Sequence, residues 1–147
     1  MKILLDTLRR AGWAPTLVFA AHVWFCHGLN AYETFPRIDI PMHLLGGAAI
    51  AFFLWTAICA GVSSGILGRP NRLGIAALAF TSTVSCAVFW EFAEFLSDRY
   101  FGTHTQAGLE DTLLDMLFGV VGGAVFVGIA SFRPKGREPS VLGGTRA

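Results

Sequence analysis

Carboxyl side chains are concentrated in the second half of the chain, at spacings that place them on common helix faces. Glu91, Glu94 and Asp98 stand at i, i+3 and i+7, and residues so spaced share one face of an α-helix. Asp111 and Asp115, spaced i, i+4, share a face in the same way. Carboxylate oxygens, joined by an imidazole nitrogen, are ligands for Mg²⁺, Mn²⁺, Fe²⁺ and Zn²⁺. The spacing therefore predicts a place where a divalent cation could be held.

These polar residues interrupt an otherwise apolar chain. Of its 147 residues 54% are apolar and only 14% charged, whereas soluble domains carry about 25% charged residues. Four apolar blocks, at about 13–32, 42–67, 73–96 and 113–132, reach the roughly 20 residues that a helix needs to cross the hydrocarbon layer. They show no strand-like alternation, so each is predicted to be a helix. The predicted fold is all-α, an integral membrane bundle of four transmembrane helices.

Lysine and arginine residues predict the orientation of this bundle. With four crossings, the N-terminus, the turn near residue 70 and the C-terminal tail share one side. That side carries nine of the eleven basic residues: Lys2, Arg9, Arg10, Arg69, Arg72, Arg133, Lys135, Arg137 and Arg146. The other side carries Arg37 and Arg99 alone. Positive residues stay in the cytoplasm, so both termini are predicted to be cytoplasmic in a multi-pass protein of the bacterial inner (plasma) membrane.

The domain organisation follows directly. Residues 1–132 form one four-helix transmembrane domain, and residues 133–147, polar and rich in glycine, form a flexible cytoplasmic tail. A signal peptide cleaved near Ala20 is the alternative for the first block, but Asp6 is unusual in such a segment and the apolar run continues past the cleavage point.

Acidic and histidine residues gather on the side opposite the termini. His43 lies about one turn inside the second predicted helix, and Asp115 one turn inside the fourth. No lysine or arginine lies in the outer half of any predicted helix, so the carboxyl groups must hold protons, share hydrogen bonds or bind a cation. The candidate metal ligands are His43, Glu91, Glu94, Asp111 and Asp115, and the candidate catalytic residues are His43, Glu91 and Glu94.

Several of these residues also have a structural interpretation. Asp39, just before Pro41, is typical of a helix cap, and Glu110 and Asp111 suit the positive end of a helix dipole. His22, on an apolar helix, is typical of a packed, hydrogen-bonded histidine. For the cluster as a whole, a protonated structural network and a proton or ion path are the alternatives to a bound cation.

Other features narrow the range of partners. The three cysteines lie inside apolar blocks without metal-site spacing, which favours buried thiols over disulfides or zinc. No basic patch with interleaved aromatics is present, so nucleic acid is not an expected partner. Gly119 and Gly123 form a GxxxG pattern, which favours close contact within the bundle, with a homo-oligomer as the alternative.

The motifs, taken in order, resemble a known group of membrane proteins. Asp39-x3-His43, Trp90-Glu91-x2-Glu94, Gly102-Thr103 through Gln106 and Asp111-Thr112-x2-Asp115-Met116, before a Gly/Ala-rich helix, resemble the VanZ-like and, more closely, the YjdF-like inner-membrane proteins. The resemblance covers roughly residues 39–128. It implies a site built from His43, Glu91, Glu94, Gln106, Asp111 and Asp115. One departure is the loop, which reads Thr103-His104-Thr105-Gln106 where YjdF-like chains have Gly-Thr-Gln.

Three functions are compatible with this pattern. The first is a membrane enzyme that acts on a lipid or lipid-linked envelope substrate through a divalent metal, with His43 or His104 as general acid or base. Against it stand the lack of a phosphate-binding Lys/Arg cluster and of a serine nucleophile motif. The second is a proton- or ion-coupled transporter, which would need a polar path to the cytoplasm. The third is a non-enzymatic envelope accessory subunit. The lipid bilayer is the expected surrounding in all three.

Overall fold

A computed structural model of the chain describes residues 2–25 and 35–132. All regular structure in these residues is helical, which confirms the all-α fold class. The α-helices are α1 (Lys2–Ala11), α2 (Trp13–Val23), α4 (Asp39–Ser63), α5 (Arg72–Phe101) and α6 (Leu109–Phe132), and a short 3-10 turn, η2 (Pro36–Ile38), precedes α4.

Three of these helices, α4, α5 and α6, are long and apolar enough to cross a membrane. The first apolar block is helical over Trp13–Val23, which is shorter than a crossing requires, and then runs into residues 26–34, outside the described part of the chain. Three candidate spans are thus found where four were expected. The fourth crossing stays a prediction, as does the tail at 133–147, which also lies outside the described residues.

The long helices extend beyond their predicted apolar blocks at one end, whereas α4 stops at Ser63, before its block ends near residue 67. α4 begins at Asp39 and α6 at Leu109, because acidic residues in a first turn are favourable at the positive end of the helix dipole. α5 begins after Asn71, whose side chain accepts a hydrogen bond from the Gly74 backbone N–H at 2.8 Å. It ends at Gly102, which adopts the left-handed conformation (φ +66°) that terminates many helices.

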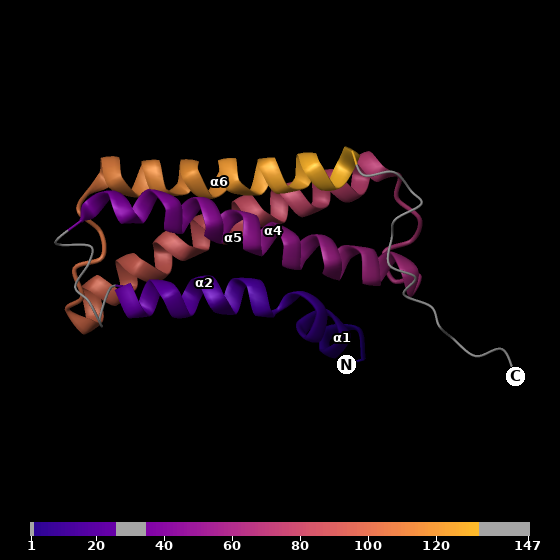
Figure 1. Cartoon of the computed structure of the whole chain (residues 1–147), viewed down its shortest axis with the longest axis horizontal. Helices are drawn as coiled ribbons and strands as arrows, with labels where there is room; N and C mark the ends of the chain where they lie inside the picture. Colours follow the sequence, from indigo (N-terminus) through magenta and orange to yellow (C-terminus); the bar gives the residue numbers. More distant parts are fainter. Residues whose placement is uncertain (1, 26–34, 133–147) are drawn as a thin grey trace, which may run out of the picture.

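A bend separates α1 from α2 (Figure 1). The two helices are joined through Gly12, whose N–H donates to the Leu8 carbonyl at 2.9 Å and whose carbonyl accepts from the Thr16 N–H at 3.2 Å. Pro15 has no N–H, so the carbonyl of Ala11 lacks the donor that would continue the helix. The missing hydrogen bond and the proline ring account for the bend.

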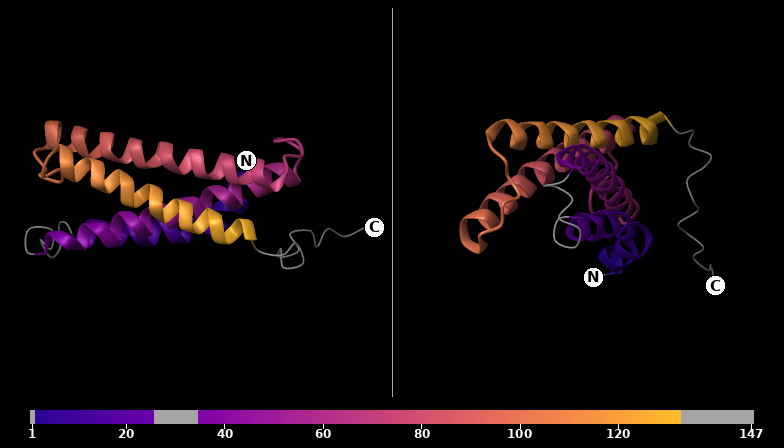
Figure 2. Two further views of the ribbon diagram at one scale, coloured as in Figure 1. Left: turned by 90° about the horizontal axis from the view of Figure 1, so that it is seen from above. Right: turned by 60° about the vertical axis from the view of Figure 1, so that its left-hand side comes forward.

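The long helices run back and forth between two ends of the bundle (Figure 1). The start of α1, the turn at residues 64–71 and the end of α6 lie at one end of the bundle (Figure 1). The ends of α2 and α5 and the starts of α4 and α6 lie at the other, which is called the site end below. α4 and α5 converge at the 64–71 turn and separate toward the site end, and α6 crosses α4, with which it makes the most extensive contact of the bundle (Figure 2).

α4 and α6 make the closest contact of the bundle, through glycine. A Cβ on Gly47 would run into the backbone carbonyl of Gly119, and a Cβ on Gly122 into that of Leu44. Gly123, the other member of the GxxxG pattern, packs against Thr83 of α5. The prediction that these glycines serve contact within the bundle is therefore confirmed.

The outer surface of the bundle is apolar. Large hydrophobic side chains on every long helix are exposed, for example Leu45, Phe92 and Leu113. The fully packed apolar interior is small and lies away from the site end, around Ala51, Ile58, Ala79 and Val127. A surface of this kind suits a protein whose surroundings are lipid chains.

Candidate metal centre

His43 is the centre of the polar cluster at the site end. It lies on α4, one turn after Asp39, and its Nε2 is 3.2 Å from Asp39 Oδ1. The same nitrogen is 3.7 Å from Asp115 Oδ1 of α6, and the opposite ring nitrogen, Nδ1, is 3.9 Å from Glu91 Oε1 of α5. The imidazole therefore faces acidic side chains from all three long helices. The topology brings them together, because α5 ends where α4 and α6 begin.

Two groups in the cluster have the geometry to hold a cation. One consists of Asp39, His43 and Asp115, and the other of His43, Glu91 and Glu94; in each, one ligand atom per residue lies within 4.8 Å of the others. Glu91, Glu94 and Asp115 are 5%, 8% and 6% exposed. All the ion pairs that these carboxyl groups make within residues 2–25 and 35–132 go to His43.

One oxygen of Glu91 lacks a partner in the described residues. The Gln106 side-chain amide donates to Glu91 Oε2 at 3.3 Å and to the Glu91 backbone carbonyl at 3.1 Å. Oε1, on the side of His43, is buried and accepts no hydrogen bond. A buried oxygen without a partner costs about 1–3 kcal/mol, so something at this position must offset that cost. An ion bound between Glu91, Glu94 and His43 would do so.

Glu94 is held from within its own helix. The indole N–H of Trp90, one turn earlier on α5, donates to Glu94 Oε1 at 2.8 Å. The Trp90 ring in turn meets Phe19 and His22 of α2 edge to face, with ring centroids 5.9 and 5.3 Å apart. Helix α2 therefore holds the Trp90 ring in place, and Trp90 in turn orients the Glu94 carboxyl group through its hydrogen bond. His22 packs against an aromatic ring, as its structural interpretation predicted.

Asp98 organises the loop that carries Gln106. Its carboxylate accepts hydrogen bonds from the hydroxyl of Thr103 at 2.6 Å, the hydroxyl of Thr105 at 2.8 Å, and the backbone N–H groups of Thr105 and Gln106 at 2.9 and 3.0 Å. These bonds fold residues 103–106 back over the end of α5. As a result, the Gln106 side chain reaches Glu91.

The glycine contact between α4 and α6 lies one turn below the cluster. Gly47 is four residues after His43, and Gly119 is four residues after Asp115, so the two glycines occupy the same faces as the two polar residues. Because the helix backbones touch at the glycines, the short aspartate side chain comes within reach of the imidazole.

The structure separates the predicted ligands into two sets. His43, Glu91, Glu94 and Asp115 lie together, whereas Asp111 belongs to neither group of possible ligands. Its carboxylate accepts from the Ala107 N–H at 3.1 Å, at the start of α6, which fits the structural role expected at a helix N-terminus. His104 is exposed on the loop, and Glu33 and His27 lie outside the described residues.

One structural interpretation was wrong. Asp39 was expected to cap a helix, but the capping position of α4 is Ile38 and no side chain accepts a hydrogen bond there. Asp39 is instead the first residue of the helix and points to His43. The i, i+4 spacing of Asp39 and His43, like that of Trp90 and Glu94, could have indicated both contacts.

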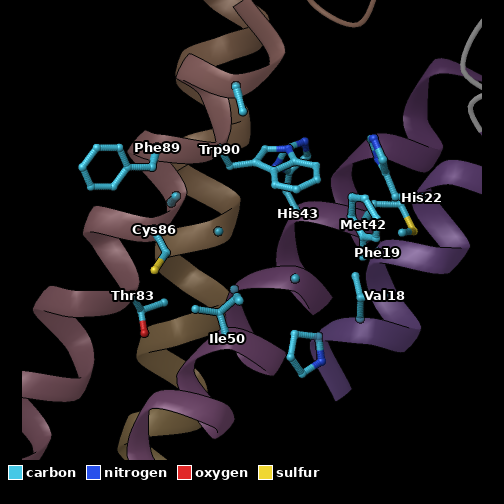
Figure 3. A pocket seen from close by; sticks show the side chains of 16 residues that line it. Val18, Phe19, His22, Met42, His43, Ile50, Thr83, Cys86, Phe89 and Trp90 are labelled. Carbon is cyan, nitrogen blue, oxygen red and sulfur yellow. The ribbon is translucent and has the colours of Figure 1, made fainter. Parts of the chain in front are cut away.

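An apolar cleft of about 450 Å³ opens beside His43 (Figure 3). α5 forms one wall with Thr83, Cys86 and Phe89, and α2 forms the facing wall with Val18 and Phe19. The remaining surface comes from α4, from Met42 and His43 down to Ile50, and from Gly119 of α6. The metal centre and the cleft thus share His43 and Trp90.

Comparison with known proteins agrees with a membrane location. Residues 7–136 match the model of DUF2238, a family of predicted membrane proteins. The chain belongs to this family. An uncharacterized protein of Thermotoga maritima is 33% identical over 100 residues, which cover 64% of this chain and 47% of that protein. The chain therefore spans about half the length of this relative. No solved structure matches the chain. The finer resemblance to VanZ-like and YjdF-like proteins stays a prediction.

Proposed function

We propose that His43, Glu91 and Glu94 bind one divalent cation, and that the protein is a membrane enzyme acting on a lipid or lipid-linked envelope substrate at the extracytoplasmic face. The observation that carries the proposal is the buried Glu91 Oε1, which has no hydrogen-bond partner in the described residues and faces the imidazole. Buried carboxyl groups on α5 and a histidine on α4 meet there, and no lysine or arginine within residues 2–25 and 35–132 forms an ion pair with them.

The surroundings of His43 support its role as a ligand. When Nε2–H is donated to Asp39, Nδ1 presents its lone pair toward Glu91 and the cation position. A carboxylate that receives the far N–H of a ligating histidine fixes the ring and raises its basicity. Asp39 would be this orienting partner. Trp90 and Gln106, which donate hydrogen bonds to Glu94 and Glu91, would orient the carboxylates of these two glutamates.

Two carboxylates with one imidazole suit Mn²⁺, Fe²⁺, Zn²⁺ or Mg²⁺. Bound there, the ion would polarise a phosphoryl or ester oxygen of the substrate. Asp115, 3.7 Å from His43 Nε2 and on the opposite side of the imidazole from Glu91, would share with Asp39 the orientation of the ring.

A coupled transporter is less well supported. It would need polar groups between the cluster and the opposite end of the bundle. Within the described residues, the apolar cluster of Ala51, Ile58, Ala79 and Val127 lies in that direction, and the buried oxygens of Thr7 and Ser131 are found only near the opposite end, in α1 and at the end of α6. The buried hydroxyl of Thr83 donates to the Ala79 carbonyl of its own helix at 2.8 Å and is not available to a passing ion.

The test is the metal content of the detergent-purified protein, first stripped with a chelator and then incubated with Mg²⁺, Mn²⁺, Fe²⁺ or Zn²⁺. Elemental mass spectrometry should find close to one ion per wild-type chain. Glu91→Gln and Glu94→Gln should lose it, and Glu110→Gln, an exposed change in the first turn of α6, should keep it. Thermal unfolding of each variant is measured to check that the fold is retained.

Wild-type protein that stays metal-free with all four ions would overturn the cation site. The cluster would then be a hydrogen-bonded structural network, and the accessory-subunit hypothesis would take its place. If the ion binds, the loaded protein is assayed for hydrolysis of lipid phosphate and ester substrates. Wild-type activity that Glu94→Gln abolishes and Glu110→Gln retains is the expected result.

A further inference from the structure

The cleft runs along the helices from the metal centre toward the middle of the bundle. Ile50 lies seven residues beyond His43 on α4, and Thr83 lies seven residues before Trp90 on the antiparallel α5. At a 1.5 Å rise per residue, both mark a depth of about 10 Å below the polar end. The volume of about 450 Å³ lies within the range of small-molecule binding sites.

Among the described residues, the side chains at the deep end of the cleft offer no free hydrogen-bonding group except the weak thiol of Cys86. Thr83 is fully buried and its hydroxyl is used by the Ala79 carbonyl, so it turns a methyl group to its neighbours. Val18, Ile50 and Cys86 supply the surrounding apolar surface (Figure 3). A peptide or sugar placed there would leave its own polar groups unpaired, whereas a hydrocarbon chain would not.

The cleft changes from polar at the site end to apolar at its deep end. Its polar side chains, His22, His43 and the Trp90 indole, are at the site end, and its apolar end points toward the middle of helices that can cross a membrane. A lipid in the adjoining leaflet has the same order, with the head group at the surface and the chain toward the midplane. The rim residues Phe19 and Phe89 are 53% and 70% exposed, so the opening between α2 and α5 faces the surrounding lipid.

We propose that this cleft holds one hydrocarbon chain of a membrane lipid, entering between α2 and α5, with its polar end at the His43 cluster. The hydrocarbon chain enters the cleft from the bilayer and not from water. The binding of this hydrocarbon chain does not depend on the proposed function, but the statement that the lipid is also the substrate rests on it. The cleft is then the part of the site that selects a lipid.

Gly46 allows a specific test. It lines the cleft, and a Cβ there would meet only the Val18 side chain at 3.9 Å, an ordinary contact. Gly46→Leu should therefore fill the cleft without disturbing the helix packing. Gly128→Leu is the matched control, because Gly128 on α6 is also helical and has open space around its Cβ position. Cys86→Phe fills the cleft from the opposite wall if Gly46→Leu fails to fold.

The probe is a phosphatidylglycerol that carries a photoactivatable diazirine midway along one acyl chain, in lipid nanodiscs with the full-length protein. Peptide mass spectrometry after illumination should find crosslinks concentrated on Ile50, Thr83 and Cys86. Gly46→Leu should reduce them about tenfold, as expected for displacing roughly two buried methylene groups. Gly128→Leu should leave them unchanged.

Crosslinks spread evenly over the exposed faces of all helices would overturn the inference, as would crosslinking of this cleft to a second protein chain. The measurement is made on metal-loaded and on chelator-treated protein. If the cleft is labelled in a protein that binds no metal, the lipid-binding site is supported and the proposed metal-dependent enzyme is rejected. A stoichiometric metal with no preferred labelling of the cleft keeps the metal centre and rejects the lipid site.

Discussion

At the scale of single residues, the polar cluster depends on side chains that orient one another. Asp39 faces His43, Trp90 donates to Glu94, and Gln106 donates to Glu91. Each of the three proposed ligands therefore has a partner outside the ligand set. Partners of this kind typically change metal affinity by about 10- to 100-fold when they are removed.

Trp90→Phe isolates one of these partners. The substitution keeps an aromatic ring against Phe19 and His22 but removes the N–H that Glu94 Oε1 accepts. We expect the affinity for Mn²⁺ or Zn²⁺ to fall about tenfold, with little change in thermal stability. Isothermal titration calorimetry of the detergent-purified protein measures it. Phe89→Leu, an exposed aromatic on the preceding residue, is the control; equal affinities for Trp90→Phe and wild type would mean that Trp90 does not orient a ligand.

Residues of the site could be predicted from the sequence where a charged side chain lies in an apolar helix. Glu91, Glu94 and Asp115 stood out because they are acidic residues in apolar helices, and the structure buries all three. Asp39 and Trp90 belong to the motifs that carry the resemblance, but residue chemistry did not place them among the candidate ligands. An aspartate before a proline and a tryptophan in an apolar helix have common structural roles, and only the packed helices show where their side chains point.

At the scale of helices, the sequence predicted the long apolar elements but not their ends. Hydropathy locates the part of a helix that lipid surrounds, and the helical turns beyond it are polar. For this reason α4 and α6 begin before their apolar blocks, and α5 continues through Ser97–Phe101 until Gly102 ends it. The bend at Gly12 and the short α1 follow from Pro15, which the apolar pattern alone does not reveal.

The contact of α4 with α6 predicts opposite outcomes at two adjacent glycines. Gly47→Ala should destabilise the protein by about 1–3 kcal/mol, because the new methyl group meets the Gly119 carbonyl and the helices must move apart. Gly46→Ala should be tolerated, because its methyl group has space. Thermal unfolding of both variants in the same detergent tests this. Equal loss of stability in the two would show that the backbones are not in contact.

The loop between α5 and α6 depends on a single carboxylate. In Asp98→Asn, an amide would face the donors of Thr105 and Gln106, so hydrogen bonds worth about 1.5–3 kcal/mol to a charged group would be lost or weakened. Hydrogen exchange at the Thr105 and Gln106 amides should rise about tenfold or more. Arg99→Gln, an exposed change on the next residue, should leave the exchange unaltered. Unchanged protection in Asp98→Asn would contradict this role.

At the scale of the whole molecule, both ends of the described chain lie at the same end of the bundle (Figure 1). The fourth crossing predicted for the first apolar block, added to the three candidate spans α4, α5 and α6, would account for this arrangement. The sequence made the same prediction from its basic residues, whereas the described residues alone contain too short an α2 to establish it.

Cysteine labelling in intact spheroplasts tests the orientation. In a chain whose native cysteines are replaced by alanine, His104→Cys should react with a membrane-impermeant maleimide, because the loop at 102–108 is predicted to be extracytoplasmic. Arg69→Cys, in the turn at the opposite end, should react only after the membrane is permeabilised. The reverse pattern would mean that the protein is inserted with its termini outside.

The glycine contact also determines how the site can respond to ions of different radius. Gly47 and Gly119 touch through their backbones, with no side chain that could rotate to make room, so the separation of His43 from Asp115 is set rigidly. α5 diverges from α4 toward the site end (Figure 2), and its glutamates have longer side chains. The cluster therefore has one fixed half, on α4 and α6, and one adjustable half, on α5. A larger ion would be accommodated by movement of Glu91 and Glu94 alone.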